Sequence, residues 1–153
     1  MNKRDSMINF CLNQANLSKC EDAQVAAILL KSDMKQIYSI GINGGPTHGK
    51  QCLCKNSLLK ESKYTCAHAE MNCLVKNKEI SDIPKIMICS KKPCVICATL
   101  IINSETNIEE VWYIEEYWDN SGPDLLKNAN IKVKQLIEYE IGKWCFADEV
   151  QSH

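Results

Sequence analysis

Two short motifs carry the residue types that bind zinc and move protons. Residues 68–70 read His-Ala-Glu, and residues 94–97 read Cys-Val-Ile-Cys with Pro93 directly before them. Two thiolates and one imidazole can hold a zinc ion and leave its fourth position open to water, as catalytic sites do and closed structural sites do not. Zinc lowers the pKa of a bound water from about 15.7 to about 7. The spacing therefore predicts a hydrolytic zinc centre with His68, Cys94 and Cys97 as ligands.

Glu70 has the position that a proton shuttle needs. It follows His68 by two residues, so in the first turn of a helix its carboxylate can approach the water without binding the metal. Taken alone, a Cys-x-x-Cys pair also fits a structural zinc site, a redox pair or coincidence, and a lone His-x-Glu carries little information. Both motifs together, each at an expected helix start and with an expected strand between them, indicate a catalytic zinc site.

The elements around the motifs predict an α/β domain. Helical spacing of apolar residues marks 5–16, and a polar turn at 31–35 joins two apolar runs into an expected hairpin. The expected strands are 23–31, 36–42, 84–89, 111–114 and 131–136, and the expected helices are 5–16, 67–76, 94–102, 123–129 and a final one at 137–146. Two strands followed by alternating helices and strands indicate a layered sheet with at least partly parallel pairing.

Length, charge and cysteine usage limit the class of protein. The 153 residues contain no repeat and no Pro- or Gly-rich linker, so we expect one domain over 1–153. No apolar run reaches the roughly 20 residues that span a bilayer, and no signal-peptide core follows the basic N-terminus. We therefore expect a cytoplasmic protein, in which the ten cysteines favour metal binding over disulfides. A net charge of −1 and a pI near 6.3 favour a small substrate over nucleic acid.

At this point the sequence resembles the cytidine and deoxycytidylate deaminase superfamily, whose signature is H-x-E with P-C-x-x-C. The resemblance runs over about residues 18–136 and includes Gly-Ile-Asn-Gly-Gly-Pro at 41–46, the stretch 98–102 after the cysteine pair, and the segment 117–131. Deoxycytidylate deaminases are the best match. The resemblance implies deamination of dCMP to dUMP, with Glu70 moving protons from water to the ring and the leaving amine. It also implies a three-layer fold with a five-stranded mixed sheet flanked by helices, and a homo-oligomer that is often a hexamer.

The resemblance also assigns substrate contacts. Asn43 would hydrogen-bond the sugar, the backbone at Ala69 would hold the base edge, and Tyr117 would line the sugar or phosphate side. The plainer alternatives are a turn residue in the left-handed region for Asn43 and a core aromatic for Tyr117. Asp22 stands where relatives often carry Arg, which removes a phosphate contact, and Ala26 replaces a Gly at the site where some relatives bind the regulators dCTP and dTTP.

A second zinc site is also implied by the resemblance. The stretch Ser-Lys-Cys at 18–20 is similar to that of bacteriophage deoxycytidylate deaminases, some of which hold a structural zinc there. The expected ligands are Cys20, His48, Cys52 and Cys54, with Cys66 further on; free thiols in a surface loop are the alternative. The remaining cysteines, Cys11, Cys73, Cys89 and Cys145, are expected to be small buried apolar residues.

Three rival functions remain open. Another free cytosine nucleoside or nucleotide could be the substrate in place of dCMP. A tRNA or single-stranded nucleic-acid deaminase would share the zinc site but needs a basic, aromatic-lined channel. Trp112, Trp118 and Trp144 could stack on bases, although such residues more often lie in cores or interfaces. A zinc-stabilised subunit without activity is the third possibility, and Glu70 argues against it because a purely structural site has no use for that carboxylate.

Overall fold

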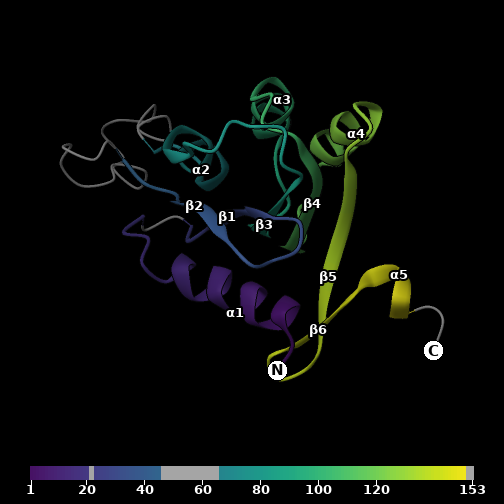
Figure 1. Cartoon of the computed structure of the whole chain (residues 1–153). Helices are drawn as coiled ribbons and strands as arrows, with labels where there is room; N and C mark the ends of the chain where they lie inside the picture. Colours follow the sequence, from purple (N-terminus) through teal and green to yellow (C-terminus); the bar gives the residue numbers. More distant parts are fainter. Residues whose placement is uncertain (21–22, 46–65, 151–153) are drawn as a thin grey trace.

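The computed structural model describes residues 1–20, 23–45 and 66–150, and these form a helix–sheet–helix sandwich (Figure 1). In chain order the elements are α1 (Lys3–Ala15), β1 (Ala26–Lys31), β2 (Ile37–Ile42), α2 (Ala69–Lys76), β3 (Lys85–Lys91), α3 (Val95–Asn103), β4 (Ile108–Glu115), α4 (Ser121–Asn128), β5 (Lys132–Glu140), β6 (Lys143–Phe146) and α5 (Ala147–Val150). No helix of this described part is long and apolar enough to cross a bilayer.

The sheet is mixed, as expected, but it has six strands and not five. Its order is β2-β1-β3-β4-β5-β6. Strand β1 is antiparallel to both β2 and β3, whereas β3, β4 and β5 run parallel to one another. The predicted hairpin of β1 and β2 is confirmed, with Lys31 N–H donating to the carbonyl of Gln36 across the turn.

The additional strand comes from the segment 137–146, for which the expectation of a final helix is wrong. Strand β5 continues to Glu140, the chain turns at Gly142, and β6 returns antiparallel to β5. Gly142 has φ +74°, a conformation that glycine adopts without strain, and its N–H donates to the Glu138 carboxylate. Ile137, Tyr139 and Ile141 alternate with polar residues, which is the two-residue period of a strand.

The alternation of side chains along β1 creates two cores. Ala27 and Leu29 face the layer of α2, α3 and α4, while Ile28 and Leu30 face α1. Strand β3 divides its buried side chains between the same two cores. Trp112 and Trp144 lie in the α1 core at 3% exposure, as the core interpretation of these residues predicts. Trp118 does not, since it is 81% exposed.

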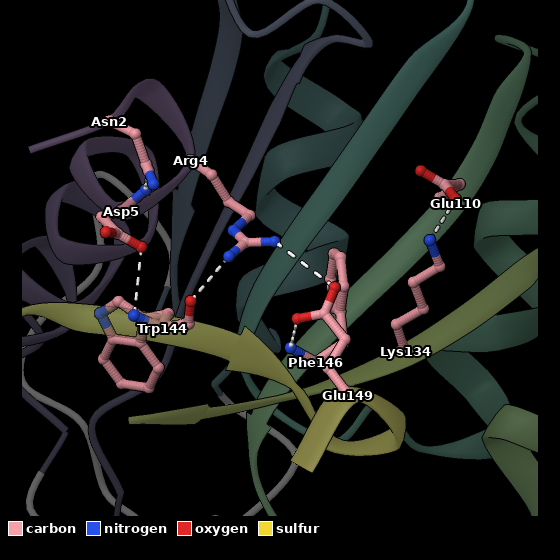
Figure 2. A network of polar contacts seen from close by, with 8 residues as sticks. All are labelled: Asn2, Arg4, Asp5, Glu110, Lys134, Trp144, Phe146 and Glu149. Carbon is pink, nitrogen blue, oxygen red and sulfur yellow. Dashed lines mark hydrogen bonds and ion pairs between the residues drawn. The ribbon is translucent and has the colours of Figure 1, made fainter. Parts of the chain in front are cut away.

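A polar network ties α1 to the β5–β6 hairpin (Figure 2). Arg4 Nη2 donates to the carbonyl of Trp144 at 2.8 Å, and the Trp144 N–H donates to the buried carboxylate of Asp5 at 3.1 Å. Asn2 caps the helix by accepting the Asp5 N–H. Glu149 accepts the N–H of Phe146 and lies 4.0 Å from the Arg4 guanidinium. Residues about 140 positions apart therefore share one set of hydrogen bonds.

Candidate active site

The two motifs meet because two helices begin at the same place above the sheet. His68 is the N-cap of α2, and Cys94 is the N-cap of α3 directly after the carboxyl end of β3. Strand β3 separates the motifs in sequence, as predicted. The dipoles of both helices present their positive ends to the side chains of these caps, which favours thiolate there.

The three predicted ligands have zinc-binding geometry. His68 Nδ1 lies 3.3 Å from Cys97 Sγ and 3.5 Å from Cys94 Sγ, and all three donor atoms lie within 4.8 Å of one another. A tetrahedral zinc with Zn–S bonds of about 2.3 Å and Zn–N bonds of about 2.0–2.1 Å places nitrogen and sulfur donors about 3.6 Å apart. The donor set therefore fits Zn²⁺, with the imidazole binding through Nδ1, an atom that the sequence did not specify.

The sulfurs already interact strongly with each other. The hydrogen bond from Cys97 lowers the pKa of Cys94 to about 4, helped by His68, whereas the same hydrogen bond and burial raise the pKa of Cys97. A lowered pKa suits Cys94 to bind a metal ion as a thiolate. Zinc held by His68, Cys94 and Cys97 would favour the thiolate form of both sulfurs.

Glu70 points into the same space from the first turn of α2. The residue is only 4% exposed, and burial raises the pKa of its carboxyl, a change that a hydrogen bond from Cys97 partly opposes. A carboxyl with a raised pKa can hold a proton at a higher pH than a solvated glutamate can. Glu70 is thus close to the metal ligands and suited to accept and release protons.

A cavity of about 430 Å³ opens over these residues. That volume lies within the range of small-molecule sites. The cavity brings the metal ligands His68 and Cys94 together with all three predicted substrate contacts. Its lining residues are Cys20, Ala23, Val25, Asn43, Cys66, Ala67, His68, Ala69, Glu70, Lys91, Lys92, Cys94 and Tyr117.

Asn43 is held rigidly at the cavity wall. Its Oδ1 accepts the Val25 N–H at 2.8 Å, and its Nδ2 donates to the carbonyl of Ala23 at 2.7 Å. These bonds to described residues leave one N–H and one lone pair of the amide for a ligand. The alternative of a left-handed turn residue is wrong, because Asn43 is not among the described residues with positive φ.

Ala69 and Tyr117 also lie at the cavity. Ala69 is the first residue of α2, where the backbone N–H has no partner within the helix. Tyr117 follows β4 and is 36% exposed, with its ring tilted against Trp118 at a centroid distance of 5.4 Å. It is therefore not a core aromatic.

Two glycines allow the motifs to pack closely against the rest of the fold. A Cβ on Gly41 in β2 would lie 2.0 Å from the carbonyl oxygen of Ala69, and one on Gly122 in α4 would lie 2.1 Å from that of Pro93. Real Cβ contacts are essentially never shorter than 3.0 Å. Both motifs therefore rest against backbone that has no room for a side chain, which the sequence alone did not reveal.

The expected second zinc site is only partly described. Cys20 is buried, and both it and Cys66 line the cavity. His48, Cys52 and Cys54 lie outside the described residues, as does Asp22. Cys11, Cys73 and Cys89 are fully buried, as predicted, while Cys145 is half-buried on β6.

Sequence reasoning missed two lysines that line the cavity, Lys91 and Lys92. Lysine is usually a solvated residue, so a Lys-Lys pair attracts no attention by its type. The signal available was position, because the pair directly precedes Pro93 and Cys94. Lys92 is only 7% exposed, which is unusual for a cation.

Comparison with solved structures gives matches over nearly the whole chain. The dCMP deaminase of cyanophage S-TIM5 in complex with dCMP and dUMP is 26% identical, with 86% of this chain and 95% of that chain covered and a TM-score of 0.71. Its apo form gives 25% identity, 88% and 98% coverage and a TM-score of 0.69. RibD of Acinetobacter baumannii shares the fold at 18% identity and a TM-score of 0.61, with 87% of this chain and 35% of RibD covered. No curated protein sequence matches significantly.

The family model for the cytidine and deoxycytidylate deaminase zinc-binding region matches residues 1–115. That range contains the first four strands, both motifs and every described residue that lines the cavity except Tyr117. The match to this family agrees with the geometry of the three donor atoms, which fits one zinc ion with an open fourth position. The chain belongs to the cytidine and deoxycytidylate deaminase zinc-binding family, and its His/Cys/Cys site is the zinc centre of a hydrolytic deaminase.

Proposed function

We propose that the protein converts dCMP and water to dUMP and ammonia. The observation that carries this proposal is that one cavity is lined by the zinc ligands His68 and Cys94, by Glu70 and by the predicted contacts Asn43, Ala69 and Tyr117. The third ligand, Cys97, has its donor atom within 4.8 Å of the other two. The substrate is supported by the likeness to the cyanophage dCMP deaminase, whose structure contains dCMP and dUMP.

The residues of the cavity have distinct tasks in this reaction. When bound, zinc lowers the pKa of water and so supplies the nucleophile. Glu70 would accept a proton from the attacking water and give it to N3 of the cytosine ring while the water oxygen bonds to C4. The same carboxyl then moves the remaining hydroxyl proton to the exocyclic amine, which leaves as ammonia and restores the carbonyl at C4.

Binding orients the base for these transfers. The N–H of Ala69 faces the edge of the base, and the remaining hydrogen-bonding capacity of Asn43 serves the sugar. Because Asn43 is anchored to Ala23 and Val25, it meets the sugar without losing further conformational freedom. Tyr117 closes the side of the cavity nearest the sugar and phosphate.

Substrate assays test the proposal directly. Purified protein is incubated with dCMP, dCTP, deoxycytidine and cytosine-containing oligonucleotides, and deaminated product is measured by chromatography. We expect dCMP to be the best substrate. Turnover of oligonucleotide alone refutes the proposal, and the near-neutral charge of the chain argues against that result.

Glu70→Gln tests the mechanism apart from the fold. The variant keeps the zinc, because Glu70 is not a ligand, and loses roughly 10²- to 10⁴-fold in kcat, which is the usual contribution of general acid–base catalysis. Glu109→Gln, on an exposed residue of β4, is the matched control and keeps full activity. Near-normal turnover by Glu70→Gln contradicts the assigned role.

We also propose the structural zinc site that Cys20 and the residues His48, Cys52 and Cys54 would form. Its support is that Cys20 is buried and that both Cys20 and Cys66 line the cavity. A closed site of this kind would stabilise the chain next to the active site.

A further inference from the structure

The two lysines at the cavity use their charges differently. Lys92 Nζ lies 2.5 Å from the Glu116 carboxylate, and it donates to Asn120 Oδ1 at 2.7 Å and to the carbonyl of Tyr117 at 3.1 Å. An ammonium has three hydrogens, and these three partners account for all of them. Lys92 therefore holds the segment after β4 in place and has no donor left for a ligand.

Lys91 lines the same cavity, and no hydrogen bond or ion pair joins its ammonium to another described residue. The ion pairs between described residues do not include Lys91. Its ammonium lies 5.2 Å from the centroid of the Tyr117 ring, a cation–π contact that leaves its hydrogens available. The residue is only partly exposed, so its charge is screened less than that of a surface lysine.

The other charges of the described lining do not attract an anion. Zn²⁺ bound by two thiolates and a neutral imidazole has no net charge, and Glu70 is neutral or negative. Lys92 is neutralised by Glu116. Lys91 is thus the cation of the described lining whose charge has no carboxylate partner.

The cavity lining offers groups for both ends of a nucleotide. A nucleoside monophosphate carries its base and its phosphate at opposite ends, and the lining supplies both a group that acts on the base, Glu70, and a cation beside an aromatic ring, Lys91 with Tyr117. A lysine donates charge-assisted hydrogen bonds to phosphate oxygens.

We propose that Lys91 binds the 5′-phosphate of the substrate and makes the enzyme select the nucleotide over the corresponding nucleoside. The inference rests on the proposed function, and it names the residue that separates dCMP from deoxycytidine. Lys92 acts as a positioning residue for the segment that carries Tyr117.

The test measures kcat/KM on dCMP and on deoxycytidine for the wild type, Lys91→Gln, Lys91→Arg and the control Lys132→Gln. Lys132 is exposed on β5 outside the cavity lining, so its variant makes the same change in net charge. We expect Lys91→Gln to lose about 10- to 100-fold on dCMP, as for loss of one charge-assisted hydrogen bond, and to change little on deoxycytidine. Lys91→Arg restores most of the preference, and Lys132→Gln leaves it unchanged.

Each other outcome overturns the inference in a distinguishable way. If Lys91→Gln loses the same factor on both substrates, or on neither, Lys91 does not select the phosphate, while deamination of dCMP stands. A wild type that does not distinguish dCMP from deoxycytidine refutes the role of Lys91 as well. Turnover of neither compound by the wild type overturns the proposed function and the inference with it. Titration of dUMP and deoxyuridine into wild type and Lys91→Gln gives an independent readout, since only the affinity for dUMP should fall.

Discussion

Gly122→Ala tests whether the close approach of α4 positions the zinc ligand Cys94. An added Cβ would lie 2.1 Å from the carbonyl oxygen of Pro93 and 2.9 Å from the carbonyl carbon of Cys94. Ordinary contact begins at 3.4 Å, so relief requires the backbones to separate by 3.4 − 2.1 = 1.3 Å. The atoms on both sides are main chain, so no side-chain rotation can remove the overlap.

The magnitude follows from what zinc tolerates. Metal–ligand distances hold within about 0.2 Å, so a shift near 1 Å at Cys94 must weaken binding. Disturbing the surroundings of a metal ligand typically costs about 10- to 100-fold in affinity or activity, and overpacking costs about 1–3 kcal/mol of stability. We expect Gly122→Ala to show both losses.

The assay combines zinc affinity by competition with a chelator, thermal unfolding and kcat/KM. Gly44→Ala is the matched control, because its Cβ would meet no atom of the described residues within 4 Å. Circular dichroism confirms that both variants keep their helices and strands. If Gly122→Ala binds zinc, unfolds and turns over substrate like the wild type, the contact between α4 and Pro93 does not position the site.

Three further predictions concern other parts of the chain. Lys85 is fully buried and donates to the carbonyls of Ser81, Ile83 and Thr106. Lys85→Met leaves these carbonyls unpaired, so we expect it to lower the free energy of unfolding by about 3 kcal/mol and Tm by roughly 6–12 °C. Lys127→Met, at an exposed position, should change neither. The hydrogen bond from Lys92 lowers the pKa of Glu116 below its ordinary value of 4.5, and a lowered pKa stabilises the fold above that pH. The difference in stability between the wild type and Glu116→Gln should therefore be full above about pH 4.5 and vanish as the pH falls. A difference that denaturant titrations find to be independent of pH contradicts this prediction. Purified wild type should contain about two zinc ions per chain and Cys20→Ser about one, as measured by mass spectrometry; one zinc ion in the wild type rules out the second site.

The active site could be predicted further than its surroundings. His68, Cys94 and Cys97 are residue types that bind zinc, and helix starts bring them together, so their types and spacing identified them together with the resemblance to the deaminase signature. Lys91 could not be found in this way. It stands out only because the charge of the neighbouring Lys92 is neutralised by Glu116, a residue 24 positions away. Gly41 and Gly122 matter because two backbones approach each other, which no local pattern encodes.

The fold shows the same division between local and distant information. The hairpin of β1 and β2 follows from two apolar runs and a polar turn, and the prediction is confirmed. The segment 137–146 contains enough apolar residues to fit a helix, but it forms the end of β5 and the strand β6 that pairs with it. The chain reverses at Gly142, which has a positive φ. Short apolar segments are ambiguous until their neighbours are known.

The polar network between α1 and β6 also has a consequence for the order in which the protein is built. The ribosome adds Arg4 and Asp5 about 140 residues before their partners around Trp144. At a translation rate of roughly 5–20 residues per second, synthesis of these roughly 140 residues takes about 7–28 s. During this time the apolar side of α1 lacks Trp144 as a cover, so a helix made before the sheet is among the last elements to complete its packing.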